Sequence, residues 1–463
     1  MNMPVKPVRS RPWWSRRALA AGALVMVLLA QGLPARAADG SLVVSALQVL
    51  ERDYAEPVHP IALLNAALAA VRAATHESAA VLPDIPSTDT EPEAEAAFLA
   101  EFSLAAPADP PAETALAYAA TQGMLDSLHD THTYFLTPSE FAASQHELNG
   151  APAFTGIGVR ITGRTDSAGV RWVFVEDVLP GSPAQAAGIK RFDRIVQAGS
   201  TPLRNATPAE ASQAVRGPAG STVVLTVLRG EQTLQVPVVR APIQSGPVEA
   251  RFVQPGIAYV RLFQFSQGAG RDVNAALQKL ALEAPLHAVI LDLRGNPGGL
   301  VTEAARVASL FLPPGTPLAT VTDQQDGTGV LVTRGMGLFA RVPLAVLVDA
   351  GSASGAEIVT GALKDNHRAT IVGEKTAGAL GGAVEVSLPE GGMSVTVERI
   401  ATPRGAQVEG VGISPDVPVT LTEADMERGV DTQLQAALQA AAMPSMLRPY
   451  PGWSESRPGG PAL

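Results

Sequence analysis

The 463-residue sequence contains no cysteine, and this absence removes several kinds of chemistry at once. Disulfide bonds, thiolate metal sites and a cysteine nucleophile are all excluded. Five of the seven histidines are scattered along the chain, without the spacing that metal ligands show. They are His59, His76, His146, His287 and His367. A phosphate-binding loop is missing too, so the sequence predicts neither a metal nor a cofactor.

Positive charge is also in short supply, with 34 Lys and Arg residues against 44 Asp and Glu residues. Six of the 34 basic residues lie within residues 1–37, which contain no acidic residue. The rest of the chain is therefore more acidic still, with 28 basic residues against 44 acidic ones. Because binding to a phosphate backbone requires clustered positive charge, a nucleic-acid partner is disfavoured.

Long apolar runs are absent except for one near the N-terminus, at residues 18–33. Basic residues precede this run, and the small residues of "ARA" (Ala35–Ala37) follow it. The pattern predicts a secretory signal peptide cleaved before Ala38, and hence a periplasmic or secreted protein. The stretch "SRRALAA" also resembles a twin-arginine signal. The alternative is a retained membrane anchor, for which the apolar run is short.

What the sequence does contain is enough apolar material for two or three domains, since 46% of its residues are hydrophobic. Residues 38–150 predict a helical region, with apolar residues at helical spacing over 41–74 and a further helix near 114–128. Between these helices, residues 76–113 are acidic and rich in Pro and Ala. We expect this insertion to be a solvated, poorly ordered surface segment with one short helix at 91–102.

Residues 151–245 alternate like short strands separated by turn residues, which predicts a small β-rich domain inserted in the chain. The stretch "VLPGSPAQAAGIKRFDRIVQAGSTPL" (178–203), together with an earlier "GIGV", resembles a PDZ domain. The resemblance implies that backbone N–H groups of the glycine turn hold a C-terminal carboxylate, while a strand edge pairs with the peptide. The turn consists of Gly156, Ile157, Gly158 and Val159. The alternative is a β-rich domain without a ligand.

Residues 246–425 alternate strands and helices, which predicts an α/β core with a mixed, largely parallel sheet. Two loops, "DLRGNPGG" (292–299) and "DAGSASGAE" (349–357), follow strands, where catalytic groups of such sheets gather. Ser354 in the second loop is a candidate nucleophile, although small residues also serve as plain punctuation between a strand and a helix. The candidate oxyanion donors are the N–H groups of Gly298, Gly299 and Gly355.

Several long motifs occur in one order and resemble the carboxyl-terminal-processing peptidases, or tail-specific proteases, over roughly residues 41–420. They are "FTGIGV", "VILDLRGNPGGLV", "VLVDAGSASGAEIVTGALKD", "ATIVGEKTAG" and "VEGVGISPDV". The resemblance implies a periplasmic or lumenal serine endopeptidase that recognises apolar C-terminal tails of proteins through its PDZ domain. Its nucleophile lies three residues before Glu357, which selects Ser354 over Ser352. An adaptor lipoprotein is a further candidate partner, and the oligomeric state is not predicted.

One departure from that family concerns the general base. Most members use a Ser–Lys dyad, with the lysine in a motif like GEKTFGKGSVQ, whereas this chain has "GEKTAGALGGAV". Ala379 occupies the place of the lysine, and Ala383 that of the glutamine. Because no lysine follows Lys375, a shifted alignment cannot restore the base.

A serine hydroxyl needs a base to become a useful nucleophile, and the sequence offers a substitute. His132 in "HDTHTYF" and Glu409 in "VEGVGISPD" resemble the histidine and glutamate of the related tricorn-like proteases. We therefore predict a triad of Ser354 as nucleophile, His132 as base and Glu409 as orienting carboxylate. Two alternatives stay open: an inactive homologue that only binds tails, and a different base such as Lys375.

The C-terminal part, residues 426–463, is expected to be accessory. The stretch "DMERGVDTQLQAALQAA" (425–441) predicts one helix that packs on the core. The Pro- and Gly-rich residues from 444 onward predict a disordered tail.

Overall fold

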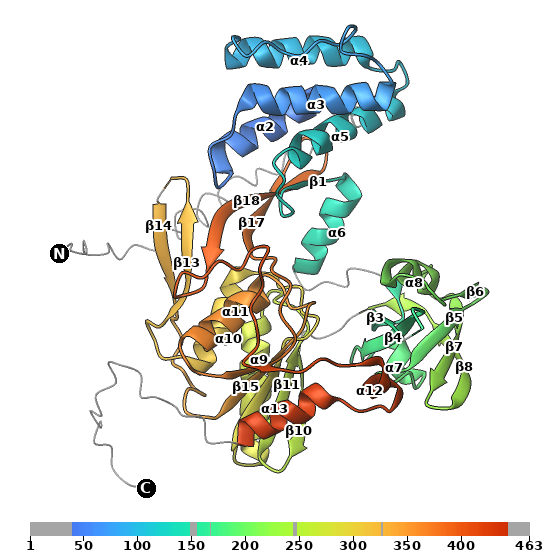
Figure 1. Cartoon of the computed structure of the whole chain (residues 1–463), viewed down its shortest axis with the longest axis vertical. Coiled ribbons are helices and arrows are strands. Elements are labelled where there is room, and N and C mark those ends of the chain that lie inside the picture. Colours follow the sequence, from blue (N-terminus) through green and yellow to red (C-terminus); the bar gives the residue numbers. More distant parts are fainter. Residues whose placement is uncertain (1–38, 149–154, 167, 244–247, 326, 443–463) are drawn as a thin grey trace, which may run out of the picture.

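The computed structural model describes residues 39–148, 155–166, 168–243, 248–325 and 327–442. The predicted signal peptide and C-terminal tail lie outside these residues. Figure 1 shows a helical arm, a separate β-rich domain and a central α/β core joined to a second sheet. In the part of the chain that is described, no helix is both long and apolar enough to cross a membrane.

Four helices form the arm that projects at the top of Figure 1. They are α2 (Ser41–Asp53), α3 (Pro60–Thr75), α4 (Glu91–Ala105) and α5 (Pro110–Asp126). The expectation of a poorly ordered, solvated segment at 76–113 is wrong. Leu82 and Ile85 are buried in the core of the arm, and Phe98 and Phe102 form the buried face of α4. The two phenylalanines are four residues apart, so they lie on the same face of the helix, and this face packs into the core of the arm.

The β-rich domain is confirmed and is built on one antiparallel sheet with the order β3-β4-β5-β7-β8. Its strands are β2 (Thr155–Gly156), β3 (Val159–Thr165), β4 (Arg171–Val178), β5 (Arg194–Ala198), β6 (Thr201–Pro202), β7 (Thr222–Arg229), β8 (Gln232–Val239) and β9 (Ala241–Pro242). Its helices are α7 (Pro183–Ala186) and α8 (Pro208–Val215). Strand β3 lies at the edge of the sheet and contacts α8, so a strand edge and a helix lie side by side.

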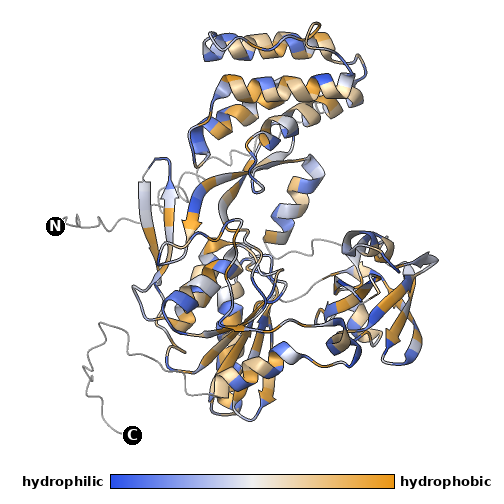
Figure 2. Ribbon diagram, viewed as in Figure 1, coloured by the Kyte–Doolittle hydropathy of each residue, from blue (hydrophilic) through white to orange (hydrophobic). Residues whose placement is uncertain are grey.

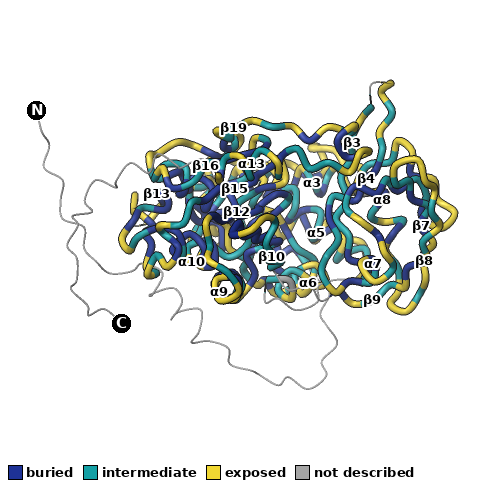
Figure 3. The backbone as a smooth tube through the Cα atoms, turned by 90° about the horizontal axis from the view of Figure 1, so that it is seen from below, coloured by how far each residue is buried: buried dark blue, intermediate teal, exposed yellow. Residues whose placement is uncertain are grey.

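The α/β core is also confirmed, with a sheet of order β10-β11-β12-β15-β16-β19 that is parallel except for β10. The strands are β10 (Val248–Gln254), β11 (Ile257–Leu262), β12 (Ala288–Asp292), β15 (Leu344–Val348), β16 (Thr370–Gly373) and β19 (Val417–Pro418). Strands β11, β12 and β15 are buried along their whole length, because helices cover both faces. Figures 2 and 3 show these strands as apolar and buried.

Alternate residues of the core strands meet different helices. One face packs on α9 (Ala269–Glu283), α10 (Val301–Phe311) and α11 (Gly355–Asp365). The opposite face packs on α13 (Thr432–Ala442), for example through Ile290 and Leu347 against Ala437. The carboxyl ends of β12 and β15 therefore lie side by side, and each is followed by one of the two glycine-containing loops.

A second, antiparallel sheet was not expected from the sequence. Its strands are β1 (Tyr134–Leu136), β13 (Pro317–Asp323), β14 (Gly327–Val332), β17 (Gly381–Ser387) and β18 (Gly392–Ala401). The segment "PLATVT" is a strand as predicted, but it pairs with β14 and β18 instead of joining the core sheet. The short helix α6 (Pro138–Leu148) follows β1. Since β1 begins just after His132 and β17 just after Ala379, this sheet brings both segments to the core.

The C-terminal segment is two helices, not the one predicted. Helix α12 (Glu423–Glu427) ends before Gly429, whose φ of +67° breaks the helix ahead of α13. Leu421 and Met426 pack on Phe174 and Phe192 of the β-rich domain. The segment thus contacts the β-rich domain through α12 and the core through α13, as Figure 1 shows.

Candidate active site

Ser354 occupies a sharp turn between β15 and α11. Its φ of +50° lies in the left-handed region, which is uncommon for a residue with a side chain and recurs at functional sites. Ser352, the other serine of the loop, is fully buried, and its hydroxyl donates to the Leu293 carbonyl at 2.8 Å. Of the two serines, Ser354 is the one in a position to react.

The carboxylate of Glu357 holds this turn in place from inside the protein. It is fully buried, and its Oε2 accepts the N–H groups of Ser354 (3.1 Å) and Ala379 (3.0 Å). Its Oε1 accepts the Thr376 hydroxyl at 2.6 Å and the Gly378 N–H at 2.8 Å. One side chain therefore fastens the serine turn to the segment after β16. Sequence reasoning used Glu357 only as a marker, although its place three residues after a helix cap signals such a contact.

The glycine loop after β12 lies directly against Ser354. A Cβ on Gly298 would be 2.6 Å from the Ser354 Cβ, so only glycine fits there. The Gly298 N–H donates to Asn296 Oδ1 at 2.8 Å. The N–H groups of Gly299 and Gly355, in contrast, donate to no acceptor in the described part of the chain. Two of the three predicted oxyanion donors therefore have no acceptor among the described residues.

His132 and Glu409 are 277 residues apart in sequence, and the fold brings them together. His132 Nε2 lies 3.0 Å from Glu409 Oε2. The same carboxylate oxygen accepts the Leu380 N–H at 2.6 Å. The side chains are 19% and 33% exposed, so the pair lies partly buried at the edge of the site. Two of the three predicted triad residues are thus in contact.

Asp130 fixes the turn that presents His132, and sequence reasoning missed it. Its Oδ1 accepts the His132 N–H at 3.0 Å, its Oδ2 accepts the Tyr54 hydroxyl at 3.0 Å, and Arg399 lies 3.6 Å away. Burial raises the pKa of Asp130, but these hydrogen bonds and the nearby charge outweigh it and hold the pKa below its usual value. Burial also raises the pKa of Tyr54, to about 12. Asp130 therefore stays an acceptor for the turn.

Ser354 and the His132–Glu409 pair come from different parts of the sequence, but they contact the same short segment, residues 379–381. The Ser354 N–H donates to the Ala379 carbonyl at 2.9 Å, while the His132 ring lies against Gly381. Among the described residues, no hydrogen bond joins the Ser354 hydroxyl to His132. Catalytic hydrogen bonds are often long before substrate binds, so the lack of this bond does not rule out His132 as a base. Lys375, the alternative base, is exposed.

The predicted peptide-binding turn of the β-rich domain lies next to the glycine loop of the core. Gly158 has a φ of +77°, and a Cβ there would be 2.3 Å from Ser182. Strand β3 follows and carries Arg160. The Nη1 of Arg160 contacts the carbonyl oxygen of Gly295, and its Nη2 lies 3.4 Å from the carbonyl oxygen of Phe263. Burial lowers the pKa of Arg160. The two loops are therefore linked through one side chain.

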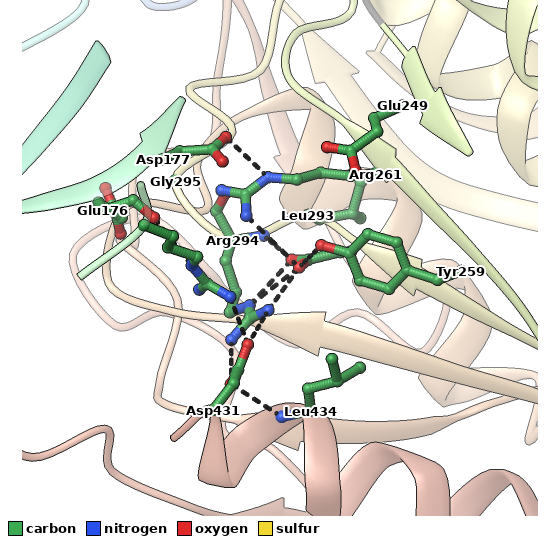
Figure 4. A network of polar contacts seen from close by, with 12 residues as sticks. Glu176, Asp177, Glu249, Tyr259, Arg261, Leu293, Arg294, Gly295, Asp431 and Leu434 are labelled. Carbon is green, nitrogen blue, oxygen red and sulfur yellow. Dashed lines mark hydrogen bonds and ion pairs between the residues drawn. The ribbon is translucent and has the colours of Figure 1, made fainter. Parts of the chain in front are cut away.

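Beneath this contact, a network of buried charges joins the β-rich domain, the core and the C-terminal helix (Figure 4). Arg261 lies between Asp177 (3.2 Å) and Asp292 (3.7 Å). Arg294 binds Asp292 at 2.6 Å and Asp431 at 2.9 Å. Burial raises the pKa of Asp292, but the adjacent arginines lower it well below its ordinary value. Each of these side chains therefore has an opposite charge within 3.7 Å.

The part of the chain that the structure describes has no three His, Asp or Glu side chains arranged to bind a metal ion. The chemistry available at this site consists of a serine hydroxyl, an imidazole–carboxylate pair and two free backbone N–H groups.

Two family models match the chain. The model of peptidase family S41 matches residues 256–419, and the model of the PDZ domain matches residues 151–228. The two matches cover the α/β core with most of the second sheet, and most of the β-rich domain. They account for the two loops, Ser354 and Glu409, whereas His132 lies outside both.

The chain is similar to several carboxyl-terminal-processing proteases. The carboxyl-terminal-processing protease of Synechocystis is 35% identical over 333 residues, which cover 69% of this chain and 76% of the relative. That of Picosynechococcus is 36% identical and covers 70% and 78%. Carboxyl-terminal-processing peptidase 2, a chloroplastic protein of Arabidopsis thaliana, is 35% identical over 65% of this chain. The match spans 60% of the Arabidopsis protein, less than two thirds of its length.

Solved structures agree on the fold. The photosystem II D1 C-terminal processing protease superposes with a TM-score of 0.53 at 25% identity, covering 88% of this chain and 98% of that one. An S41 protease from Bacteroides fragilis gives a TM-score of 0.55 at 16% identity and covers 85% and 96%. The chain therefore shares its fold with these solved proteins over most of its length.

Proposed function

Because the chain belongs to the carboxyl-terminal-processing proteases of peptidase family S41, we propose that it hydrolyses peptide bonds through an acyl-enzyme on Ser354, with His132 as its base. The observation that carries this proposal is the 3.0 Å contact between His132 and Glu409 beside the Ser354 turn. An imidazole with a carboxylate on one ring nitrogen is the arrangement that activates a serine hydroxyl. It occurs here in a chain whose lysine position is occupied by Ala379.

The contact with Glu409 also assigns roles to the two ring nitrogens. When the His132 Nε2–H donates to Glu409, the lone pair on Nδ1 is free to take the proton from the Ser354 hydroxyl. The serine oxygen then adds to the carbonyl carbon of the substrate, and the N–H groups of Gly299 and Gly355 stabilise the oxyanion. The imidazolium returns the proton to the leaving amine, which leaves an acyl-enzyme. Water, deprotonated by the same imidazole, then adds to the acyl carbon, and the acid product leaves as the imidazolium returns the proton to the Ser354 oxygen.

The PDZ domain supports a substrate that is a protein with an apolar C-terminal tail. On this proposal, N–H groups of the turn at residues 156–159 bind the terminal carboxylate, and the edge of β3, an edge strand of its sheet, pairs with an extended peptide. Arg160, the residue after this turn, contacts the carbonyl of Gly295 in the glycine loop. On this proposal, tail binding acts on the glycine loop through Arg160. The leader motif supports a location outside the cytoplasm, in the periplasm or secreted.

A second candidate function is a catalytically inactive protein that binds tails. Two observations favour it: Ala379 at the place of the lysine, and a Ser354 hydroxyl without a hydrogen bond to His132 among the described residues. On this proposal the PDZ domain would capture tails without subsequent cleavage. The two candidates differ only in whether His132 reaches Ser354 when a substrate is bound.

The deciding experiment measures cleavage of an unfolded protein with an apolar C-terminus by the chain that begins at Ala38. We expect Ser354→Ala and His132→Ala each to lower kcat about 10⁴-fold or more. His146→Ala, an exposed histidine on α6, serves as the matched control and should retain activity within about twofold. Loss in Ser354→Ala alone would refute the histidine base. Tail binding without cleavage by the parent chain would establish the inactive alternative.

A further inference from the structure

Three consecutive residues, Ala379, Leu380 and Gly381, contact all three members of the proposed triad through their backbone. The Ala379 carbonyl accepts the Ser354 N–H at 2.9 Å. The Leu380 N–H donates to Glu409 Oε2 at 2.6 Å. Gly381 lies against the ring of His132. Nucleophile, carboxylate and base come from three distant parts of the sequence, and this segment is where they meet.

Gly381 is a glycine because of the space around it, not because of its backbone conformation. Its φ is not positive, so a residue with a side chain could adopt this conformation at the start of β17. A Cβ there, however, would lie 2.5 Å from His132 Cδ2, 2.8 Å from Cγ and 3.1 Å from Nε2. The two separations to ring carbons are too short for any Cβ, and the one to Nε2 is tighter than most real Cβ contacts. Even the smallest side chain would therefore displace the imidazole.

The ring has little freedom to move away without losing its partner. Glu409 is fixed by the Leu380 N–H, one residue before Gly381, and the backbone of His132 is fixed by Asp130. A displacement of the ring by about 1 Å would break the 3.0 Å contact between Nε2 and Glu409, given the narrow range of hydrogen-bond lengths. The absence of a side chain at residue 381 is thus a condition for the histidine–glutamate pair.

We propose that Gly381 is a positioning residue that sets His132 against Glu409, and that this position decides whether the chain can use a histidine as its base. The inference rests on the proposed triad and deepens it. In the lysine-type motif GEKTFGKGSVQ, the corresponding position is a serine, whose Cβ would occupy the space that the His132 ring fills here. Loss of the lysine at position 379 and loss of the side chain at position 381 are then two parts of one change.

The variants that test this proposal are Gly381→Ala and Gly381→Ser, made in the chain that begins at Ala38. The matched control is Gly329→Ala on β14, where a Cβ would meet nothing within 4 Å and φ is not positive. We expect Gly381→Ala to lower kcat by about 10²-fold, the usual contribution of a positioned base, and Gly381→Ser to lower it at least as much. KM, binding of a tail peptide and the activity of Gly329→Ala should stay within about twofold.

A purely structural effect of the added methyl group is separated by combining the variants. In the His132→Ala background the ring is gone, so Gly381→Ala should cause no further loss of activity and should recover any thermal stability that it lost alone. A further loss of activity or stability in that background would overturn the proposal, and so would a fully active Gly381→Ala. If His132→Ala itself were fully active, the triad would be refuted, and with it the role of Gly381.

A spectroscopic readout decides the role of Gly381 without relying on activity. In a chain labelled with ¹⁵N at histidine, the proton shared between His132 Nε2 and Glu409 should give a downfield signal that His132→Ala removes. We expect the signal to persist in Gly329→Ala and to disappear in Gly381→Ala. Its persistence in Gly381→Ala would overturn the inference. Were the parent chain inactive but the signal lost in Gly381→Ala, the proposed function would fail while the positioning role of Gly381 would stand.

Discussion

Two buried polar clusters lie at the carboxyl ends of the core strands, and they stabilise their buried carboxylates by different groups. At the candidate active site, Glu357 is surrounded by three backbone N–H groups and one hydroxyl. At the interface with the PDZ domain, Asp292 is surrounded mainly by the guanidinium groups of Arg294 and Arg261 (Figure 4). The carboxylate of the first cluster is bound mainly by backbone N–H groups, and that of the second mainly by charged side chains.

This difference decides how each cluster can be damaged. Backbone N–H groups survive almost every substitution, so the active-site cluster is vulnerable only at its carboxylates, at the Thr376 hydroxyl and at positions of close approach such as Gly381. A buried ion pair, in contrast, loses its balance when either partner is removed, and the charge left behind is costly. The interface should therefore control stability, whereas the active-site cluster should control activity as much as stability.

The largest effect on stability is expected from Arg294→Met. The change leaves Asp292 and Asp431 without their shared guanidinium, which should lower the free energy of unfolding by about 3–5 kcal/mol. Urea denaturation of the full chain measures it. Arg271→Met is the control, because Arg271 is 80% exposed and its partner Asp272 33% exposed, so this pair should contribute less than about 1 kcal/mol. Equal losses in the two variants would show that burial does not separate them.

Glu357→Gln tests the other side of the comparison. The amide keeps one acceptor oxygen but turns an NH₂ group toward two donors, and each unsatisfied buried donor costs roughly 1–3 kcal/mol. We expect a loss of about 3 kcal/mol in unfolding free energy together with a fall in kcat of about 10²-fold, since the Ser354 turn loosens. Glu283→Gln, an exposed residue of α9, should change neither. Full activity with lowered stability would show that Glu357 supports the fold alone.

The fold could be predicted from the sequence wherever burial gives the apolar residues a regular spacing along the chain. Strands β11, β12 and β15 are apolar throughout because both faces of their sheet are covered, and the parallel core follows from their alternation with helices. Alternation cannot say which sheet a strand joins, so β13 was assigned to the wrong one. The insertion at 76–113 was misjudged because its many acidic residues concealed the spacing of Phe98 and Phe102.

Only those residues of the candidate site that stand in recognisable sequence motifs could be predicted. The sequence named Ser354, His132 and Glu409, and the last two are in contact. It did not show Asp130 or the role of Gly381, because these act through backbone geometry that no local pattern encodes. Nor did it show that the Gly298 N–H is already bound to Asn296 Oδ1. Such contacts depend on segments far apart in sequence meeting at one point.

The pH dependence of stability should come from the interface. The pKa of Asp431 in the folded protein is about 2 and its ordinary value is 3.8; burial raises it, but Arg294 and Arg191 lower it further. A depressed pKa gives stability that is present above about pH 4 and lost as the pH falls toward 2, here about 2 kcal/mol. The difference in unfolding free energy between the parent and Asp431→Asn should therefore shrink between pH 5 and 2.5, as urea denaturation measures. A constant difference would contradict the assignment.

The smallest effect is expected from Lys375→Ala, which sharpens the comparison at the active site. Lys375 is exposed, and the neighbouring residues of its segment are held by backbone contacts, so removing its ammonium group should change unfolding free energy by less than about 0.5 kcal/mol. Cleavage should stay within about twofold, because the proposed base is His132. A fall of 10²-fold or more, with unchanged stability, would instead make Lys375 the base. The active site would then depend on a charged side chain, as the interface does, and the difference between the two clusters would disappear.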